Sequence, residues 1–139
     1  MSKNKLDRVV LDTNIILSKI INSEFENLID TLLFHSVEVY TCEEQLAELQ
    51  NNLSKPKILK FLKRKPSEII EMIRDIFLNT SIDKRFDRAN EKDNFLFDLA
   101  YTVKSYYIVT GDKPLLNIKR IGKIELITLV NWMLLLNKK

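Results

Sequence analysis

Four acidic residues are spaced so that an α/β fold could bring their carboxylates together: Asp12, Glu48, Asp93 and Asp112. Asp12 directly follows the apolar run Val-Val-Leu, and Asp112 follows the run Tyr-Ile-Val-Thr-Gly. Parallel strands end at the same edge of a sheet, so both carboxylates would face one cleft. Clustered carboxylates repel one another, and a hard divalent cation such as Mg²⁺ or Mn²⁺ removes that conflict. A metal site of this kind is suited to a phosphodiester substrate.

Each member of the pair Asp12 and Asp112 has a simpler interpretation, because Asp is also favoured as a helix N-cap. Two neighbouring polar residues share this ambiguity. Asn14 could hydrogen-bond the Asp12 carboxylate or a substrate phosphate, or it could cap a helix. The hydroxyl of Thr110 stands beside Asp112, and Gly111 is expected to relieve a tight turn from strand to helix.

The other two acids are placed less firmly by pattern. Asp93 lies early in a predicted helix with Asn90 three residues before it, which is also a capping arrangement. Asp98 lies about 140° around that helix from Asp93, so we expect it to face solvent or a basic partner. For the second acid of the set, periodicity does not choose among three glutamates of one helix, namely Glu43, Glu44 and Glu48.

Strands and helices that could position these acids alternate along the chain. Apolar runs predict strands at 8–11, 37–40, 106–109 and 123–127. Helical spacing predicts helices at 14–21 and 24–34, a helix opened by Thr41 in a capping box with Glu44, and further helices near 57–63, 67–77, 90–103 and 130–136. This alternation predicts a three-layer α/β/α fold with a central parallel sheet of about four to five strands.

Composition limits the alternatives. A chain of 139 residues with 45% hydrophobic residues should form a single domain over 1–139, and two glycines disfavour a turn-rich β-sandwich. The single Cys42 and single His35 exclude an internal disulfide and a Cys/His zinc cluster, and we expect a packed thiol and an ordinary imidazole. The polar N-terminus, without a long apolar run, predicts a cytoplasmic protein without a membrane partner. The net charge of +3 favours anionic partners only mildly.

Four motifs in order resemble the PIN domain: Leu-Asp-Thr-Asn, Glu-Gln-Leu-Ala-Glu-Leu, Lys-Asp-Asn-Phe-Leu-Phe-Asp-Leu-Ala and Ile-Val-Thr-Gly-Asp-Lys-Pro-Leu-Leu. More narrowly, the chain resembles the branch identified as toxin components of type II toxin–antitoxin systems, the VapC-like ribonucleases. The last segment, Ile-Glu-Leu-Ile-Thr-Leu-Val-Asn-Trp-Met-Leu-Leu-Leu, is similar to the last strand and helix of that branch. The resemblance extends from about residue 9 to residue 136.

The resemblance implies a PIN-like nuclease with an acidic Mg²⁺ or Mn²⁺ pocket, acting as a metal-dependent endoribonuclease. It implies that the catalytic and metal-binding acids are Asp12, Glu48, Asp93 and Asp112, supported by Asn14 and Thr110, and it selects Glu48 over its neighbours. Relatives often carry an acid where this chain has Asn90, so the pocket could hold one negative charge fewer. The implied partners are RNA and a cognate antitoxin, and a homodimer is compatible with the family.

RNA held near an acidic pocket needs positive charge close by. Arg85, Arg88 and Lys113 flank the acids in sequence and are our candidates for binding substrate phosphates. A second run, from Lys55 to Lys65, contains six basic residues and no acid, and Lys57, Lys60 and Arg64 of this run would share one helical face. Its alternative interpretation is a solvated helix face.

Two further functions remain open from the sequence. One is a nucleic-acid or protein binding module with a degenerate pocket, for which Asn90 and the basic run are the motives. The other is a structure-specific DNA nuclease, which has the same acid chemistry but little room here for elements that hold branched duplexes.

Overall fold

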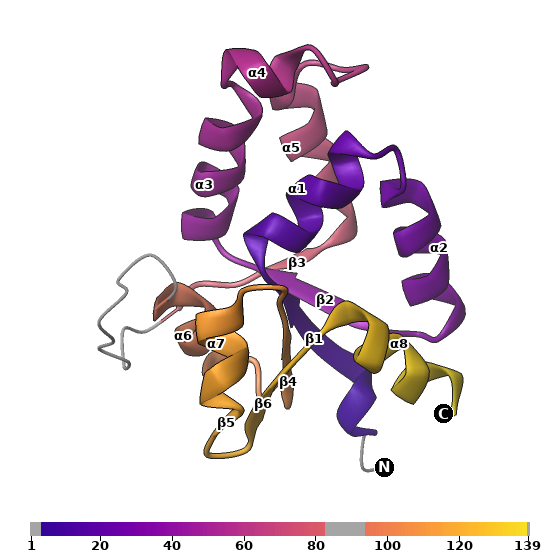
Figure 1. Ribbon diagram of the computed structural model, residues 1–139, viewed down its shortest axis with the longest axis vertical. Coiled ribbons are helices and arrows are strands. Elements are labelled where there is room, and N and C mark those ends of the chain that lie inside the picture. Colours follow the sequence, from indigo (N-terminus) through magenta and orange to yellow (C-terminus); the bar gives the residue numbers. More distant parts are fainter. Residues whose placement is uncertain (1–3, 83–93, 139) are drawn as a thin grey trace.

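The computed structural model describes residues 4–82 and 94–138, and these residues build a six-stranded sheet with helices on both faces (Figure 1). The strand order is β3-β2-β1-β4-β6-β5. All neighbouring strands are parallel except β5 and β6, which are antiparallel. The strands are β1 (Arg8–Leu11), β2 (Glu38–Thr41), β3 (Leu78–Asn79), β4 (Tyr107–Val109), β5 (Arg120–Ile121) and β6 (Ile124–Ile127). The predicted α/β class is therefore confirmed.

The sheet has six strands where four to five were predicted, and the two strands for which the sequence predicted no range, β3 and β5, are the shortest. β3 and β5 have two residues each, too few for an alternating or apolar pattern to be recognised. Among the described strands, β5 makes the one antiparallel pairing, because it forms a hairpin with β6 through Gly122, whose φ is +57°. Glycine adopts such a left-handed conformation without steric cost.

The described helices begin and end close to the predicted positions wherever the sequence predicted bounds, which it did not for the helices at 5–7 and 113–118. They are a short 3₁₀ helix η1 (Lys5–Asp7), then α1 (Thr13–Ile21), α2 (Phe25–Phe34), α3 (Glu43–Leu53), α4 (Pro56–Leu59), α5 (Pro66–Ile76), α6 (Asn94–Thr102), α7 (Lys113–Ile118) and α8 (Leu129–Asn137). α4 is shorter than predicted, so Lys60 and Arg64 do not share a helical face with Lys57. The predicted helix start at residues 90–93 lies outside the described residues.

Alternate residues of the central strands pack on opposite sides of the sheet. Val9 and Leu11 of β1 join a core with α1, α2, α3, α5 and α8, whereas Val10 joins a second core with α6 and α7. A strand buried on both faces reads as a continuous apolar run, which is why β1 could be recognised from sequence. Asp12 follows Leu11 directly, so its position is fixed by a strand that is packed on both faces of the sheet.

The predicted capping box at Thr41 is wrong. Thr41 is the last residue of β2, and Cys42 is the N-cap of α3 without a side-chain cap. The Thr41 hydroxyl instead donates a hydrogen bond of 2.7 Å to the side-chain Oε1 of Gln45, in the first turn of α3. The Cys42 thiol is buried, as predicted.

In the part of the chain that the structure describes, no helix has the length and apolar character required to cross a membrane.

Candidate active site

The candidate site lies where the two central strands end. β1 and β4 are parallel neighbours, with Leu11 paired to Val109. The backbone N–H of Asp12 donates to the Val109 carbonyl at 2.8 Å, and that of Thr110 donates to the Ile127 carbonyl at 2.9 Å. The sheet therefore places Asp12 and the Thr110–Asp112 segment at the same carboxyl edge, as the sequence pattern predicted.

The Thr110 hydroxyl connects the two acid-bearing segments. It donates a hydrogen bond of 2.6 Å to Asp12 Oδ2, and it accepts one of 3.0 Å from the backbone N–H of Asp112. Thr110 is fully buried, so these partners are fixed without competition from water. The predicted neighbourhood of Asp12, Thr110 and Asp112 is present in the structure.

Both aspartates also cap helices. Asp12 is the N-cap of α1, and its Oδ1 accepts from the backbone N–H of Asn14 at 3.4 Å. Asp112 is the N-cap of α7, and its Oδ2 accepts from the N–H of Leu115 at 3.3 Å. The capping interpretation is therefore correct for each residue. It does not exclude a ligand, because an ionised carboxylate offers about four acceptor positions.

The surroundings of Asp12 disfavour the ionised form of its carboxyl group. Asp12 is only 4% exposed, and burial raises the pKa of its carboxyl group, against a lowering by the Thr110 hydrogen bond. The negative charge of Asp112 raises the pKa of Asp12 further. Beside it, the Thr13 hydroxyl is buried and has no hydrogen-bond partner among the described residues. Oxygen donors with excess negative charge and an unsatisfied hydroxyl are chemically suited to a hard cation.

Gln45 is a positioning residue that sequence reasoning missed. It is fully buried, and its Nε2 donates a 2.7 Å hydrogen bond to the carbonyl of Leu11, the residue before Asp12. Because its Oε1 also accepts from Thr41, Gln45 ties α3 to the ends of β1 and β2. A polar residue within the buried leucine stripe of α3 was the signal that could have revealed it. Glu48 follows three residues later on α3 and is half-buried.

Glu43, one of the three glutamates left open by periodicity, is engaged elsewhere. Arg74 donates two hydrogen bonds of 2.8 Å to its carboxylate, and Asn79 donates a third at 2.7 Å. The Arg74 guanidinium and then Asn79 lower the pKa of Glu43 to about 2. Glu44 is exposed. Glu43 is thus part of a link between α3, α5 and β3 rather than a free ligand.

Of the two alternatives predicted for Asp98, exposure to solvent is wrong, since the residue is 2% exposed, and a basic partner stays a prediction. Its neighbours on α6 are buried almost all around the helix, so a helical wheel has no clear solvent face there: Leu96, Phe97, Leu99 and Ala100. Asn14 and Lys113 are both exposed, with Lys113 at the first position of α7. Asp93, Arg85, Arg88 and Asn90 lie outside the described residues.

Three of the four predicted acids, Asp12, Glu48 and Asp112, lie within the described residues. Within residues 4–82 and 94–138, no group of three or more carboxylate, imidazole or thiol side chains is arranged to hold a metal ion. The pair Asp12 and Asp112 is therefore the part of the predicted set that the described geometry joins, through Thr110.

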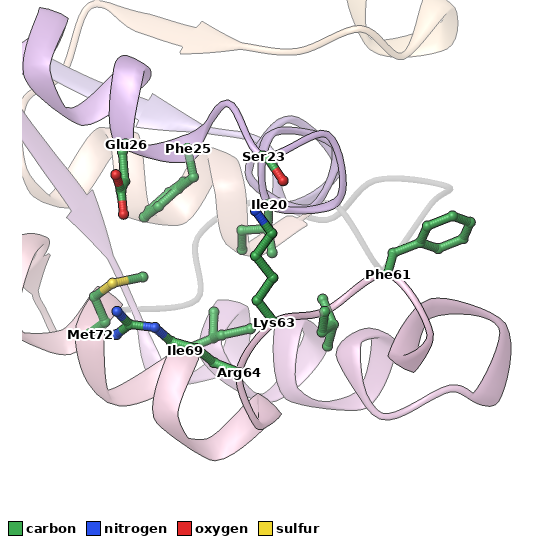
Figure 2. Close-up of a pocket in the computed structure, with 10 residues that line it drawn as sticks. Ile20, Ser23, Phe25, Glu26, Phe61, Lys63, Arg64, Ile69 and Met72 are labelled. Carbon is green, nitrogen blue, oxygen red and sulfur yellow. The ribbon is translucent and has the colours of Figure 1, made fainter.

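Lys63 and Arg64 of the basic run line a cavity that includes none of these acids. Figure 2 shows Lys63 and Arg64 extending between the α1–α2 turn and α5, beside Phe25, Ile69 and Met72. The cavity measures about 200 Å³, and none of the sequence-predicted site residues lines it.

Comparison with known proteins identifies a family. The profile of the PIN domain matches residues 8–114. An uncharacterized protein of Methanocaldococcus jannaschii is 28% identical over 126 residues, which cover 86% of this chain and 79% of that protein. Among solved structures, VapBC2 from Rickettsia felis, bound to a DNA fragment from its promoter, has a TM-score of 0.59 at 17% identity and covers 87% of this chain and 98% of its own. The PIN domain endonuclease Utp24 has a TM-score of 0.58 at 18% identity, covering 94% and 91%.

Proposed function

Because the chain belongs to the PIN domain family, we propose that it is a metal-dependent endoribonuclease, the toxin component of a toxin–antitoxin pair. The observation that carries the proposal is the pair of carboxylates, Asp12 and Asp112, at the ends of adjacent parallel strands. The Thr110 hydroxyl between them orients Asp12. Similarity of fold to a PIN domain endonuclease supports nuclease chemistry in general.

Asp12 and Asp112 would hold the metal ion, with Glu48 and Asp93 completing its oxygen ligands. Asn14, exposed at the start of α1, would contact the substrate or the carboxylate of Asp12. A bound Mg²⁺ or Mn²⁺ would lower the pKa of the attacking water and neutralise charge on the leaving oxygen. Burial of Asp12 favours a role in metal binding. Its ionised carboxylate is unfavourable without a partner charge, and a bound cation would stabilise that ionised form.

A cleavage assay on single-stranded RNA tests the proposal. We compare wild type with Asp12→Asn, which keeps the shape of the side chain and an acceptor oxygen but removes the charge. The matched control is Glu44→Gln, the same change at an exposed position of α3. We expect cleavage that depends on Mn²⁺ or Mg²⁺, is abolished by chelator, and falls at least about 100-fold in Asp12→Asn but not in the control.

Three outcomes would contradict this function. Cleavage that survives the chelator or Asp12→Asn would exclude chemistry at the proposed acids. RNA binding without turnover by pure wild type would identify a binding module instead. Preferential cleavage of flap DNA over single-stranded RNA would identify a structure-specific DNA nuclease.

The toxin assignment has its own test. The fold similarity to VapBC2 supports it, and it requires a cognate protein that silences the nuclease. We expect a small protein encoded beside this gene to co-purify with the chain and to suppress RNA cleavage at equimolar amounts. A nuclease that remains fully active with every adjacent gene product would restrict the proposal to a ribonuclease without an antitoxin.

A further inference from the structure

A cavity of about 710 Å³ opens at the edge of the sheet opposite to Asp12 and Asp112. Its lining comes from the C-terminal end of α6, the segment that leads into β4, and the turn that joins β5 to β6. Tyr106 lines it just before β4, whereas Thr110 follows β4 at the other end. At about 3.3 Å per residue, the cavity and the candidate active site are about 13 Å apart along this strand.

Aromatic rings and lysines share the lining of this cavity. Tyr101 is 51% exposed and Tyr106 is half-buried, so both rings can be reached from solvent. Lys104 and Lys123 are exposed at the cavity, and Lys5 Nζ lies 5.3 Å from the centre of the Tyr106 ring. The other lining residues are apolar or small, and no carboxylate is among the described residues that form the wall.

This combination matches the chemistry of a single nucleic-acid strand. Unpaired bases stack on aromatic side chains, and the phosphates between them are neutralised by lysine or arginine. An apolar small molecule would leave the lysines without a role. An acidic protein segment would leave the accessible tyrosine rings without stacking partners.

The segment between the cavity and the candidate active site is also basic. From Lys113, beside Asp112, to Lys123, at the cavity, it carries four basic residues and no acid. Lys113, Lys119 and Lys123 are exposed, whereas Arg120 is paired with Glu125 at 2.8 Å. α7 occupies the start of this segment, with Lys113 at its first position and Lys119 as its C-cap, so the exposed charges lie at the two ends of the helix and, with Lys123, at the cavity.

We propose that this cavity is a second binding site for the RNA strand, distinct from the acidic site. One unpaired base would stack on Tyr101 and Tyr106, and adjacent phosphates would contact Lys104 and Lys123. The strand would then pass along α7 to the acids. The inference rests on the proposed function in taking RNA as the substrate, but binding at the cavity requires neither a metal ion nor cleavage.

The experiment measures fluorescence anisotropy of a labelled single-stranded RNA long enough to reach both sites, with chelator present to prevent turnover. Tyr101→Ala should weaken binding about 5-fold or more, while Tyr101→Phe, which keeps the ring, should bind as wild type does. The double variant Lys104→Gln/Lys123→Gln should reduce the salt slope of log K by about 1.4, corresponding to two phosphates. Thermal unfolding of each variant confirms that it is folded.

The matched control is Lys19→Gln/Lys138→Gln, which removes the same charge from the last turn of α1 and the C-cap of α8, outside both proposed sites. Wild-type affinity in the two cavity variants, or an equal loss in the control, would overturn the proposal. So would binding of a free mononucleotide at the cavity combined with unchanged RNA affinity of the cavity variants.

If RNA is bound through these residues but never cleaved, the second site stands and the ribonuclease function fails. If RNA is cleaved but the cavity variants bind normally, the second site alone fails.

Discussion

Replacing Thr110 with Val tests the hydrogen-bond bridge at the centre of the candidate site. Val has nearly the same shape as Thr, so the fully buried position stays filled. The substitution removes the donor at 2.6 Å from Asp12 Oδ2 and the acceptor at 3.0 Å from the Asp112 N–H. The change therefore isolates the hydroxyl from the packing.

The structure allows the magnitude to be worked out. A hydrogen bond to a charged group contributes about 2 kcal/mol, and loss of the acceptor for the half-buried Asp112 N–H costs about 1 kcal/mol more. The free energy of unfolding should fall by about 3 kcal/mol. For 139 residues, with about 2.1 cal/mol/K of unfolding entropy per residue, this corresponds to a Tm about 10 °C lower.

Thermal and urea unfolding of metal-free protein provide the first measurement, and Mn²⁺ titration by calorimetry the second. A partner that orients a metal ligand typically contributes about 10- to 100-fold in affinity, and we expect a loss of that size. The control is Thr31→Val on α2, whose hydroxyl donates only to the Asn27 carbonyl within its own helix. A Tm decrease no larger than in the control would refute the reasoning, since the bridge would then contribute nothing specific.

Three further predictions follow from single residues. Gln45→Leu should lower the free energy of unfolding by about 2–4 kcal/mol, because it leaves the Leu11 carbonyl and the Thr41 hydroxyl unpaired in the core. Urea titration measures this change, and an unchanged urea midpoint would contradict the connection between α3 and β1 through Gln45. The pKa of Glu43 in the folded protein is about 2, below its ordinary value of 4.5, so the contribution of its carboxylate to stability is present above pH 4.5 and is lost as pH falls towards 2. Glu43→Gln should therefore lower Tm at pH 6 but not at pH 2. An equal decrease of Tm at both pH values would refute the stabilising contact of the ionised carboxylate with Arg74 and Asn79. Burial raises the pKa of the Cys42 thiol to about 12, so a chromogenic disulfide at pH 8 should react far more slowly with native than with unfolded protein, and equal rates would show that the thiol is accessible.

The parts of the fold that sequence predicted are those that bury continuous apolar runs. β1 was predicted with the bounds it has, because Val9, Val10 and Leu11 form a continuous apolar run whose side chains are buried on both faces of the sheet. β3 and β5 could not be predicted, since two residues carry no periodicity and their pairing is decided by tertiary contacts. The start of α3 was misplaced because Thr41 has the residue type of a cap but the backbone of a strand.

For the candidate site, local position was predictable and long-range connection was not. The place of Asp12 and Asp112 follows from the strands that precede them, so pattern alone located the pair. The bonds of Thr110 to Asp12 and of Gln45 to Leu11 join residues 98 and 34 positions apart, and no local pattern encodes them. Asp98 was misjudged because α6 is buried around most of its circumference there.

Gly111 has a consequence for experimental access to the site. A Cβ added at this position would meet no atom within 4 Å, and the backbone there is not left-handed, so the turn does not require glycine, contrary to the expectation from sequence. A cysteine introduced at 111 would stand next to Asp112 with open space around it, while the natural thiol is buried. A spin label or fluorophore could thus be attached selectively one residue from the carboxylate, and arrival of a metal ion or an RNA strand could be followed directly.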